Sequence, residues 1–162
     1  MKLVPGNDKI LTTPCSLYEF TDQDDLEKTT AEMLKFMHEK NGVGLAAPQV
    51  GLSHRMFVIY KEPYLIINPD IIEYSDDKSK MREGCLSFPG LFLPIERANS
   101  IILTYQNIKG EFITDRFTGM MARIIQHETD HVNGIVFQNR TSKLSLVMAD
   151  KKRKKLIKEN RL

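Results

Sequence analysis

Two histidines stand four residues apart in this chain, and a glutamate directly follows the first, in the run His127-Glu128-Thr129-Asp130-His131. On a helix, four residues advance about 400°, so both imidazoles would lie on one face, where they can bind the same metal ion. Glu128 is rotated by about 100° from His127, which places it beside the metal as a base for water. The run therefore predicts metal-assisted hydrolysis on a single helix.

The flanking residues favour a helix over 119–132, with Thr118 as N-cap and Asn133-Gly134 as the stop. Its inward stripe would contain four residues at helical spacing: Met120, Ile124, His127 and His131. One inward histidine is often a core residue satisfied by hydrogen bonds. Two on one stripe, beside a glutamate that is costly to bury without a role, favour metal ligands.

The N-terminal part predicts a second helix over 22–40, capped by Thr21 or Asp22 and ended by Asn41-Gly42. Its apolar stripe contains Leu26, Thr30, Met33, Leu34 and Met37. Residues 42–49 are small, apolar and interrupted by glycine and proline, so we expect a closely packed loop there.

The middle of the chain is rich in strand-forming residues. The predicted strands cover residues 56–60, 65–68, 71–74, 100–106 and 111–117. Short connections favour antiparallel pairing, and the separation of strands from helices indicates an α+β fold. We expect antiparallel sheets packed around the histidine helix, with the N-terminal helix beside them.

Composition limits the remaining possibilities. A length of 162 residues with 41% hydrophobic residues fits one domain over 1–162, with 141–162 as a basic C-terminal tail or helix. Two cysteines, Cys15 and Cys85, are too few for a disulfide scaffold and favour a reducing, cytoplasmic location. No leader-like or membrane-spanning apolar stretch is present, and the net charge is only +2. We therefore expect neither a membrane nor a DNA partner.

A catalytic metal site usually needs three protein ligands, and the histidine helix supplies two. No further histidine follows it, and the later acids, Asp150 and Glu159, lie near the end of the chain. Upstream, the segment Glu83-Gly84-Cys85-Leu86-Ser87 offers a thiol. A lone cysteine is commonly a small buried hydrophobe, as we expect for Cys15, so spacing by itself leaves the third ligand open.

Three sequence segments, taken in their order along the chain, resemble those of a known family and so indicate the third ligand. They are Gly42-Val43-Gly44-Leu45-Ala46-Ala47-Pro48-Gln49, then Glu83-Gly84-Cys85-Leu86-Ser87, then Gln126-His127-Glu128-Thr129-Asp130-His131. Over residues 5–140 the chain resembles the peptide deformylase family. The resemblance implies a hydrolase that removes the N-formyl group from formyl-methionine at the start of new polypeptides and releases formate.

The same resemblance implies a role for each matching residue. Cys85, His127 and His131 would hold one divalent ion, Fe(II) in the family's usual form, with zinc, nickel or cobalt as substitutes. Glu128 would take a proton from the attacking water and pass it to the departing amine. The Gln49 side chain and the Leu86 backbone N–H would stabilise the oxyanion.

Substrate-binding residues also carry over from the family: Val43, Gly44, Gly84 and Leu86. The glycines at 42 and 44 would let a peptide backbone approach and pair as an added strand. Val43 and Leu86 would help to form the pocket for the methionine side chain. Glu83 is expected to pair with Arg97 and so to hold the cysteine segment in place.

The chain departs from the family pattern after the third motif. Val132 stands where leucine is common, Val136-Phe137 replaces Leu-Phe, and Asn139 stands where an aspartate is common. The apolar changes are conservative. The missing charge at Asn139 puts an ion pair at that position in doubt.

The C-terminal residues 151–162 carry a formal charge of +6, which leaves −4 for the rest of the chain. One interpretation is a solvated, frayed helix. The other is a contact with ribosomal RNA, which would place the enzyme near emerging formyl-methionine.

Two further functions compete with formyl removal. A zinc endopeptidase uses the same histidines and glutamate, but its third ligand is usually a carboxylate or a histidine. A non-catalytic metal-binding module would more often have four protein ligands and would not need Glu128.

Overall fold

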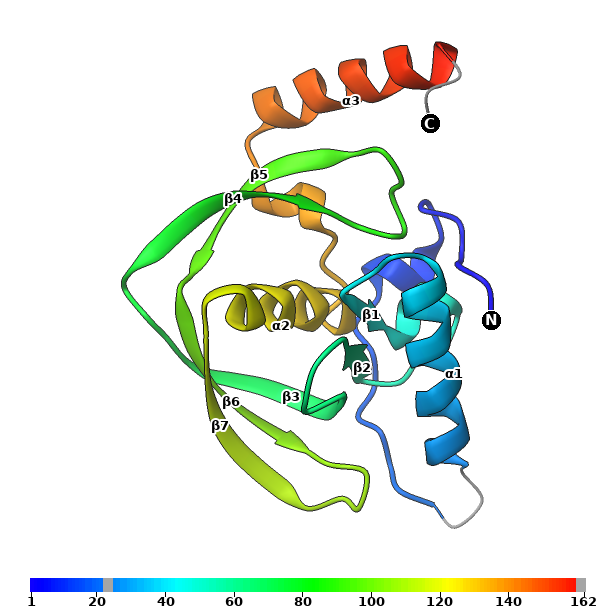
Figure 1. Cartoon of the computed structure of the whole chain (residues 1–162), viewed down its shortest axis with the longest axis vertical. Coiled ribbons are helices and arrows are strands. Elements are labelled where there is room, and N and C mark those ends of the chain that lie inside the picture. Colours follow the sequence, from blue (N-terminus) through cyan, green and yellow to red (C-terminus); the bar gives the residue numbers. More distant parts are fainter. Residues whose placement is uncertain (22–24, 160–162) are drawn as a thin grey trace.

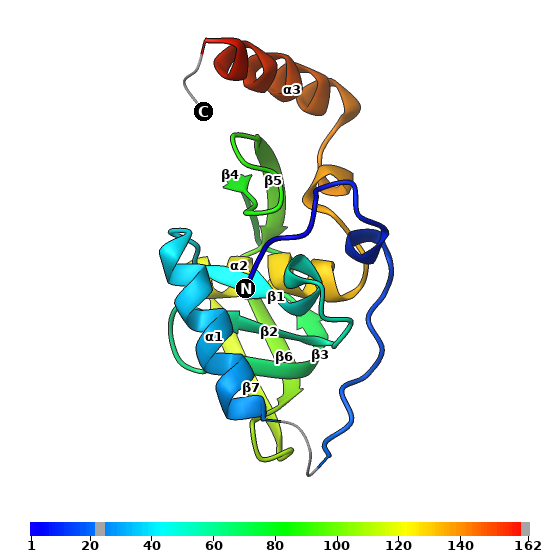
Figure 2. The same ribbon diagram turned by 90° about the vertical axis from the view of Figure 1, so that its right-hand side faces the viewer.

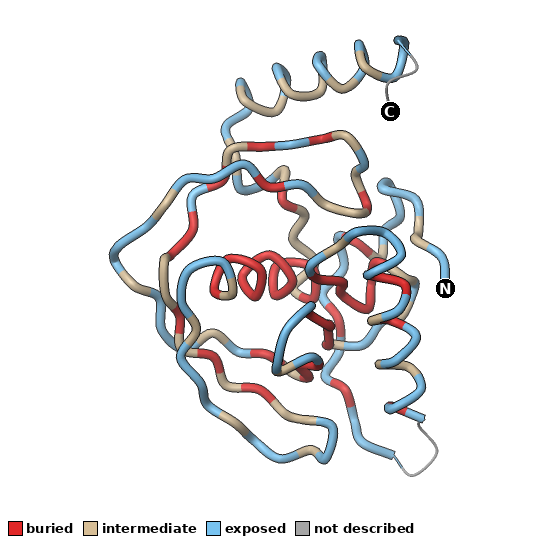
Figure 3. Tube along the Cα trace, in the orientation of Figure 1, coloured by how far each residue is buried: buried red, intermediate tan, exposed pale blue. Residues whose placement is uncertain are grey.

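A central helix organises the fold. The structure, a computed structural model, describes residues 1–21 and 25–159. Helix α2 (Gly119–Val132) begins after Thr118 and ends at Asn133, as predicted, and strands surround it in Figure 1. Every residue from Ala122 to Val132 is buried, so the helix is red along most of its length in Figure 3. Polar residues on it must therefore find partners inside the protein.

Two antiparallel sheets lie around α2, which confirms the α+β prediction. The larger has the order β1-β2-β3-β6-β7. Its strands are β1 (Gly44–Ala46), β2 (Met56–Ile59), β3 (Leu65–Tyr74), β6 (Ser100–Gln106) and β7 (Phe112–Thr118). The smaller sheet pairs β4 (Lys78–Gly84) with β5 (Phe92–Ala98). One core cluster fills the space between α2 and the larger sheet, through residues such as Phe57, Leu103 and Ile125.

Three details of the strand prediction were wrong. The separate strands predicted at 65–68 and 71–74 are one strand, because Asn68 takes a positive φ of 49° and the register shifts there without ending the pairing. Strands β4 and β5 were not predicted. Residues 42–49 are not a loop throughout, since β1 pairs with β2 and a 3-10 turn follows over Ala47–Val50.

Helix α1 (Leu26–Glu39) starts later than predicted. Asp25 is its N-cap and accepts a hydrogen bond from the Lys28 N–H, whereas the proposed cap Asp22 lies outside the described residues. The helix ends where expected, with Asn41 at φ 54°. Met33 and Met37 are fully buried in a second core cluster, with residues of β1 and β2. This packing fixes the start of β1 against the end of α1.

The C-terminal region forms helix α3 (Lys143–Lys158), after a 3-10 turn over Phe137–Arg140. None of its described residues is buried. Leu146 and Ala149 rest on a small cluster that includes Leu93 and Phe137, so α3 lies beside β5 and apart from the rest of the protein (Figures 1 and 2). Within the described part of the chain, no helix is long and apolar enough to cross a membrane.

Candidate active site

Three side chains from distant parts of the chain converge beside α2. His127 and His131 lie on α2, and Cys85 directly follows β4. Cys85 Sγ is 3.2 Å from His131 Nε2, and the ligand atoms of all three residues lie within 4.8 Å of one another. Among the described residues this is the only group of three or more histidine, cysteine or acidic side chains that could hold a metal ion.

The pKa values of the two imidazoles shift in opposite directions. Burial would lower the pKa of His127, but hydrogen bonds with Cys85 and Glu83 outweigh it and raise the pKa to about 10, so this ring must release a proton when it binds a metal. Burial lowers the pKa of His131 well below its usual value, so this ring is neutral and able to ligate. Nδ1 of His127 lies 3.0 Å from Oε2 of Glu83, which leaves Nε2 of His127 for the ion. A carboxylate behind a ligating histidine fixes the tautomer and the orientation of the ring. The donor set therefore fits a divalent metal.

Glu128 is buried on α2, with only 4% of its surface exposed, and it lines the cavity described below. Its Oε2 has no hydrogen-bond partner among the described residues. Burial raises the pKa of this carboxyl to about 7. A buried carboxyl with a free oxygen and a pKa near neutrality has the properties of a general base.

Gly44 leaves the space that Glu128 occupies. A Cβ at Gly44 would lie 2.8 Å from Cδ of Glu128, and one at Gly42 would lie 2.8 Å from Cδ1 of Leu86. These glycines are therefore needed for packing within the site itself. The sequence predicted a closely packed segment that also lets a substrate approach, but it did not identify Glu128 and Leu86 as the side chains that need the space.

Gln49 is buried next to the cysteine. Its Oε1 accepts a hydrogen bond from the Ala46 N–H at 2.8 Å. This bond turns Nε2 toward Ser87 Oγ at 3.1 Å and Cys85 Sγ at 3.4 Å. The backbone N–H of Leu86 makes no hydrogen bond to any described residue. Two donors, one side-chain amide and one backbone N–H, thus lie around Cys85.

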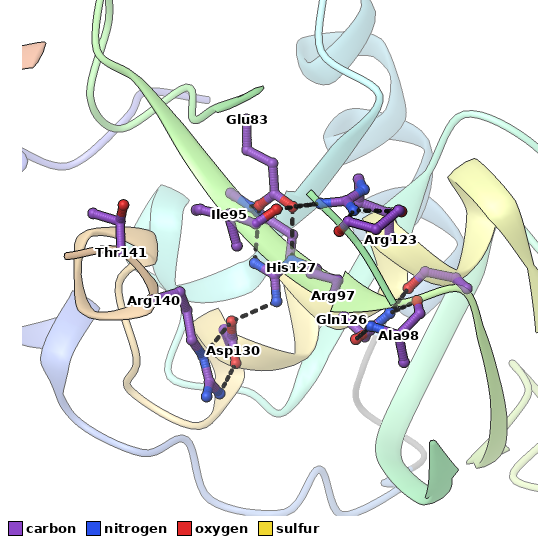
Figure 4. A network of polar contacts seen from close by, with 12 residues as sticks. Glu83, Ile95, Arg97, Ala98, Arg123, Gln126, His127, Asp130, Arg140 and Thr141 are labelled. Carbon is purple, nitrogen blue, oxygen red and sulfur yellow. Dashed lines mark hydrogen bonds and ion pairs between the residues drawn. The ribbon is translucent and has the colours of Figure 1, made fainter. Parts of the chain in front are cut away.

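A network of buried charges, the Glu83 network, connects the smaller sheet to α2 (Figure 4). Arg97 donates two hydrogen bonds to Glu83, at 2.8 and 2.9 Å, so the predicted pairing is present. Arg123 donates a further bond to Glu83 at 2.6 Å. Burial alone would raise the pKa of Glu83, but the hydrogen bonds with His127 and Arg97 outweigh it and lower the pKa to about 2. Glu83 is therefore a carboxylate throughout the physiological range.

The network continues through Asp130, which the sequence interpretation did not single out. Asp130 accepts one bond from Arg97 at 2.9 Å and two from Arg140, at 2.5 and 3.1 Å. Arg140, the residue after Asn139, thus forms an ion pair with Asp130 on α2. Arg123 and Asp130 were missed, although their positions four residues before and three after His127 place them on the same helix.

A cavity of about 660 Å³ opens beside these residues. It is lined by Gln49, Cys85, His127 and Glu128, and by the four predicted substrate-binding residues Val43, Gly44, Gly84 and Leu86. His131 is not part of its lining. Large apolar side chains that line the cavity remain exposed, namely Val43, Met81, Phe92 and Met120. The site can therefore receive a ligand with an apolar side chain.

Comparison with known proteins agrees with this geometry. The polypeptide deformylase family matches residues 1–146. A peptide deformylase from Thermotoga petrophila is 45% identical over 131 residues, which cover 80% of each chain. The structure of peptide deformylase from Thermotoga maritima, at 40% identity, has a TM-score of 0.83 and covers 87% of this chain and 97% of its own.

A second solved structure is a peptide deformylase from Synechococcus elongatus in complex with actinonin. It is 37% identical, with a TM-score of 0.87, and the match covers 94% of this chain and 85% of that one. The family match over most of the chain, together with a cysteine and two histidines able to hold a metal ion, leads to one conclusion. The chain belongs to the polypeptide deformylase family, the hydrolases that remove the N-formyl group from newly made polypeptides.

Proposed function

We propose that Cys85, His127 and His131 hold one divalent metal ion at which the formyl amide of formyl-methionyl peptides is hydrolysed. The observation that carries this proposal is the convergence of the three ligand atoms within 4.8 Å, beside a buried carboxyl. Three protein ligands leave a coordination position open, as in catalytic sites. A divalent ion there supplies Lewis acidity toward water and the formyl carbonyl.

Glu128 is the proposed general base. Because burial raises its pKa to about 7, the carboxylate can accept a proton from the attacking water near neutral pH. The protonated carboxyl can then donate that proton to the departing amine. The absence of a side chain at Gly44 leaves the space in which the Glu128 side chain lies.

Gln49 and Leu86 are the proposed oxyanion donors. Gln49 is held by the Ala46 N–H, so its amide nitrogen is oriented before substrate binds. The Leu86 N–H is free among the described residues. Donors that are already in place stabilise a developing negative charge without the cost of reorientation.

The substrate main chain is proposed to bind as an added strand between Gly44 and Gly84. The larger sheet ends at β1, which pairs with β2 alone among the described strands, and β4 pairs with β5 alone. Free strand edges offer backbone donors and acceptors to an extended peptide. Val43 and Leu86, both on the cavity wall, would then contact the methionine side chain.

Fe(II) is the proposed native ion, with zinc, nickel and cobalt as possible substitutes. A thiolate with two imidazoles suits several of these metals. A thiolate beside an oxidisable iron predicts loss of activity in air. Metal analysis after anaerobic purification tests the identity of the ion, and full activity that persists in air with zinc bound would contradict iron.

A formate-release assay under nitrogen tests the function. We expect release from formyl-Met-Ala-Ser and no cleavage of a peptide blocked at both ends. A chelator should abolish release, and Fe(II) or Co(II) should restore it. Cleavage of the blocked peptide would indicate an endopeptidase, and failure to release formate would overturn the proposal.

The basic end of the chain is proposed to contact ribosomal RNA, with the enzyme working in the cytoplasm where new chains emerge. Support comes from α3, whose residues 151–155 are all basic and none of whose described residues is buried. Binding of this kind weakens with salt. Co-sedimentation with ribosomes at low salt, with and without residues 151–162, tests it, and equal binding by both forms would contradict it.

A further inference from the structure

Two cations at the cavity have no role in the proposed mechanism. Besides Cys85, the lining residues that can carry charge are Lys40, Arg82, Glu83, Arg123, His127 and Glu128. Glu83, Arg123 and His127 belong to the Glu83 network, and Glu128 is buried. Lys40 and Arg82 are instead exposed to solvent. Neither forms an ion pair with a carboxylate in the described part of the chain.

The two cations come from different walls of the cavity. Lys40 is the C-cap of α1, directly before the segment that leads through Val43 into β1. Arg82 lies on β4, three residues before Cys85. Each cation is held over an aromatic ring: Lys40 Nζ is 5.6 Å from the centre of Phe36, and the Arg82 guanidinium is 5.7 Å from that of Phe92. Phe92 lines the cavity, so its contact keeps the Arg82 charge there, and neither contact neutralises its cation.

A peptide bound at this site must pass between the two walls. Its formyl end would lie at Cys85 and the histidines, and its main chain would follow the free edges of β1 and β4. Side chains of an extended peptide recur every ~3.3 Å, so those shortly after methionine would lie near both cations. Acidic side chains there would gain two ion pairs, and basic ones would be repelled.

We propose that Lys40 and Arg82 are specificity-determining residues that make this enzyme favour formylated peptides with acidic side chains in the positions after methionine. The inference rests on the proposed function. Because both cations are exposed, the preference for an acidic over a basic residue should be modest, about fivefold in kcat/KM. It should act through KM, since the cations do not contact the reacting atoms, and it should disappear at high salt.

The test compares formyl-Met-Ala-Asp, formyl-Met-Ala-Ser and formyl-Met-Ala-Lys as amides, at low and high salt. The variant is Lys40→Glu/Arg82→Glu. A matched control, Lys28→Glu/Lys109→Glu, makes the same change in net charge at exposed lysines outside the cavity lining. Lys40→Gln/Arg82→Gln serves as a second variant if the charge reversal prevents folding.

We expect the wild type and the control to favour the Asp peptide, the Glu variant to favour the Lys peptide, and the Gln variant to favour neither. Equal kcat/KM for Asp and Lys peptides in the wild type would overturn the inference. The inference would also be overturned if both cavity variants kept the preference for the Asp peptide, or if the control variant lost it. The Ser peptide separates the two proposals, because its failure to react with the wild type would contradict the proposed function itself.

Discussion

Helices α2 and α3 are similar in length, at 14 and 16 residues, and both carry charged side chains, yet the environments of those charges are opposite. Arg123 and Asp130 on α2 are buried and paired inside the protein, Asp130 with Arg97 and Arg140. Charges on α3 are exposed and pair weakly with one another, as Lys154 does with Asp150. Buried charges of the first kind position reactive groups, whereas exposed charges of the second kind are available to a partner.

The largest expected loss of stability comes from removing a buried charge that contacts α2. Arg97→Ala removes the partner shared by the buried carboxylates of Glu83 and Asp130. Glu83 then keeps only Arg123 as an arginine partner, and Asp130 keeps only Arg140. Breaking a buried pair in this way should lower the free energy of unfolding by about 3–5 kcal/mol, measured by urea denaturation. A loss below about 1 kcal/mol would show that the Glu83 network does not hold β4 against α2.

A smaller effect is expected from one added methyl group beside α2. Gly44→Ala should cost about 1–3 kcal/mol of unfolding free energy, because its Cβ would lie 2.8 Å from Cδ of Glu128. Turnover should fall as well, because Glu128 is displaced. In a Glu128→Ala background the methyl group meets no carboxylate, so most of the stability cost should vanish. If Gly44→Ala lowered the free energy of unfolding equally with and without the Glu128 side chain, the steric clash would not be with Glu128.

The smallest effect is expected on α3. Lys154→Ala removes an exposed pair to Asp150 at 2.8 Å, in which the lysine side chain is 75% exposed. The free energy of unfolding should change by about 0.5 kcal/mol or less, and formate release should not change. A loss as large as that of Arg97→Ala would remove the contrast between the two helices.

The sequence predicted the parts of the molecule that depend on local signals. Helix α2 follows from its periodicity, from Thr118 and from Asn133-Gly134. Strand β4 was not predicted because most of its side chains are polar and exposed, and its inward residue Glu83 is stabilised by partners distant in sequence. Arg123 was missed for the same reason, since its role depends on Glu83, 40 residues earlier.

In the candidate active site too, some features could be predicted from the sequence and others could not. Its motifs brought Cys85 and both histidines into consideration, because each motif is short and contiguous. The requirement for Gly44 was not predictable from the sequence, since it depends on where the Glu128 side chain lies after α2 packs against β1. The helices and the short motifs could thus be predicted from the sequence, whereas the side-chain contacts between different helices and strands could be identified only from the structure.

The most direct measurement is metal content and formate release for Glu128→Gln beside the wild type. Glutamine keeps the shape of the side chain but cannot accept a proton from water. We expect one metal ion per chain in both proteins and a drop in turnover of about 10²–10⁴-fold in the variant. Turnover within about tenfold of the wild type, or loss of the metal itself, would contradict the assignment of Glu128 as the general base of a three-ligand metal site.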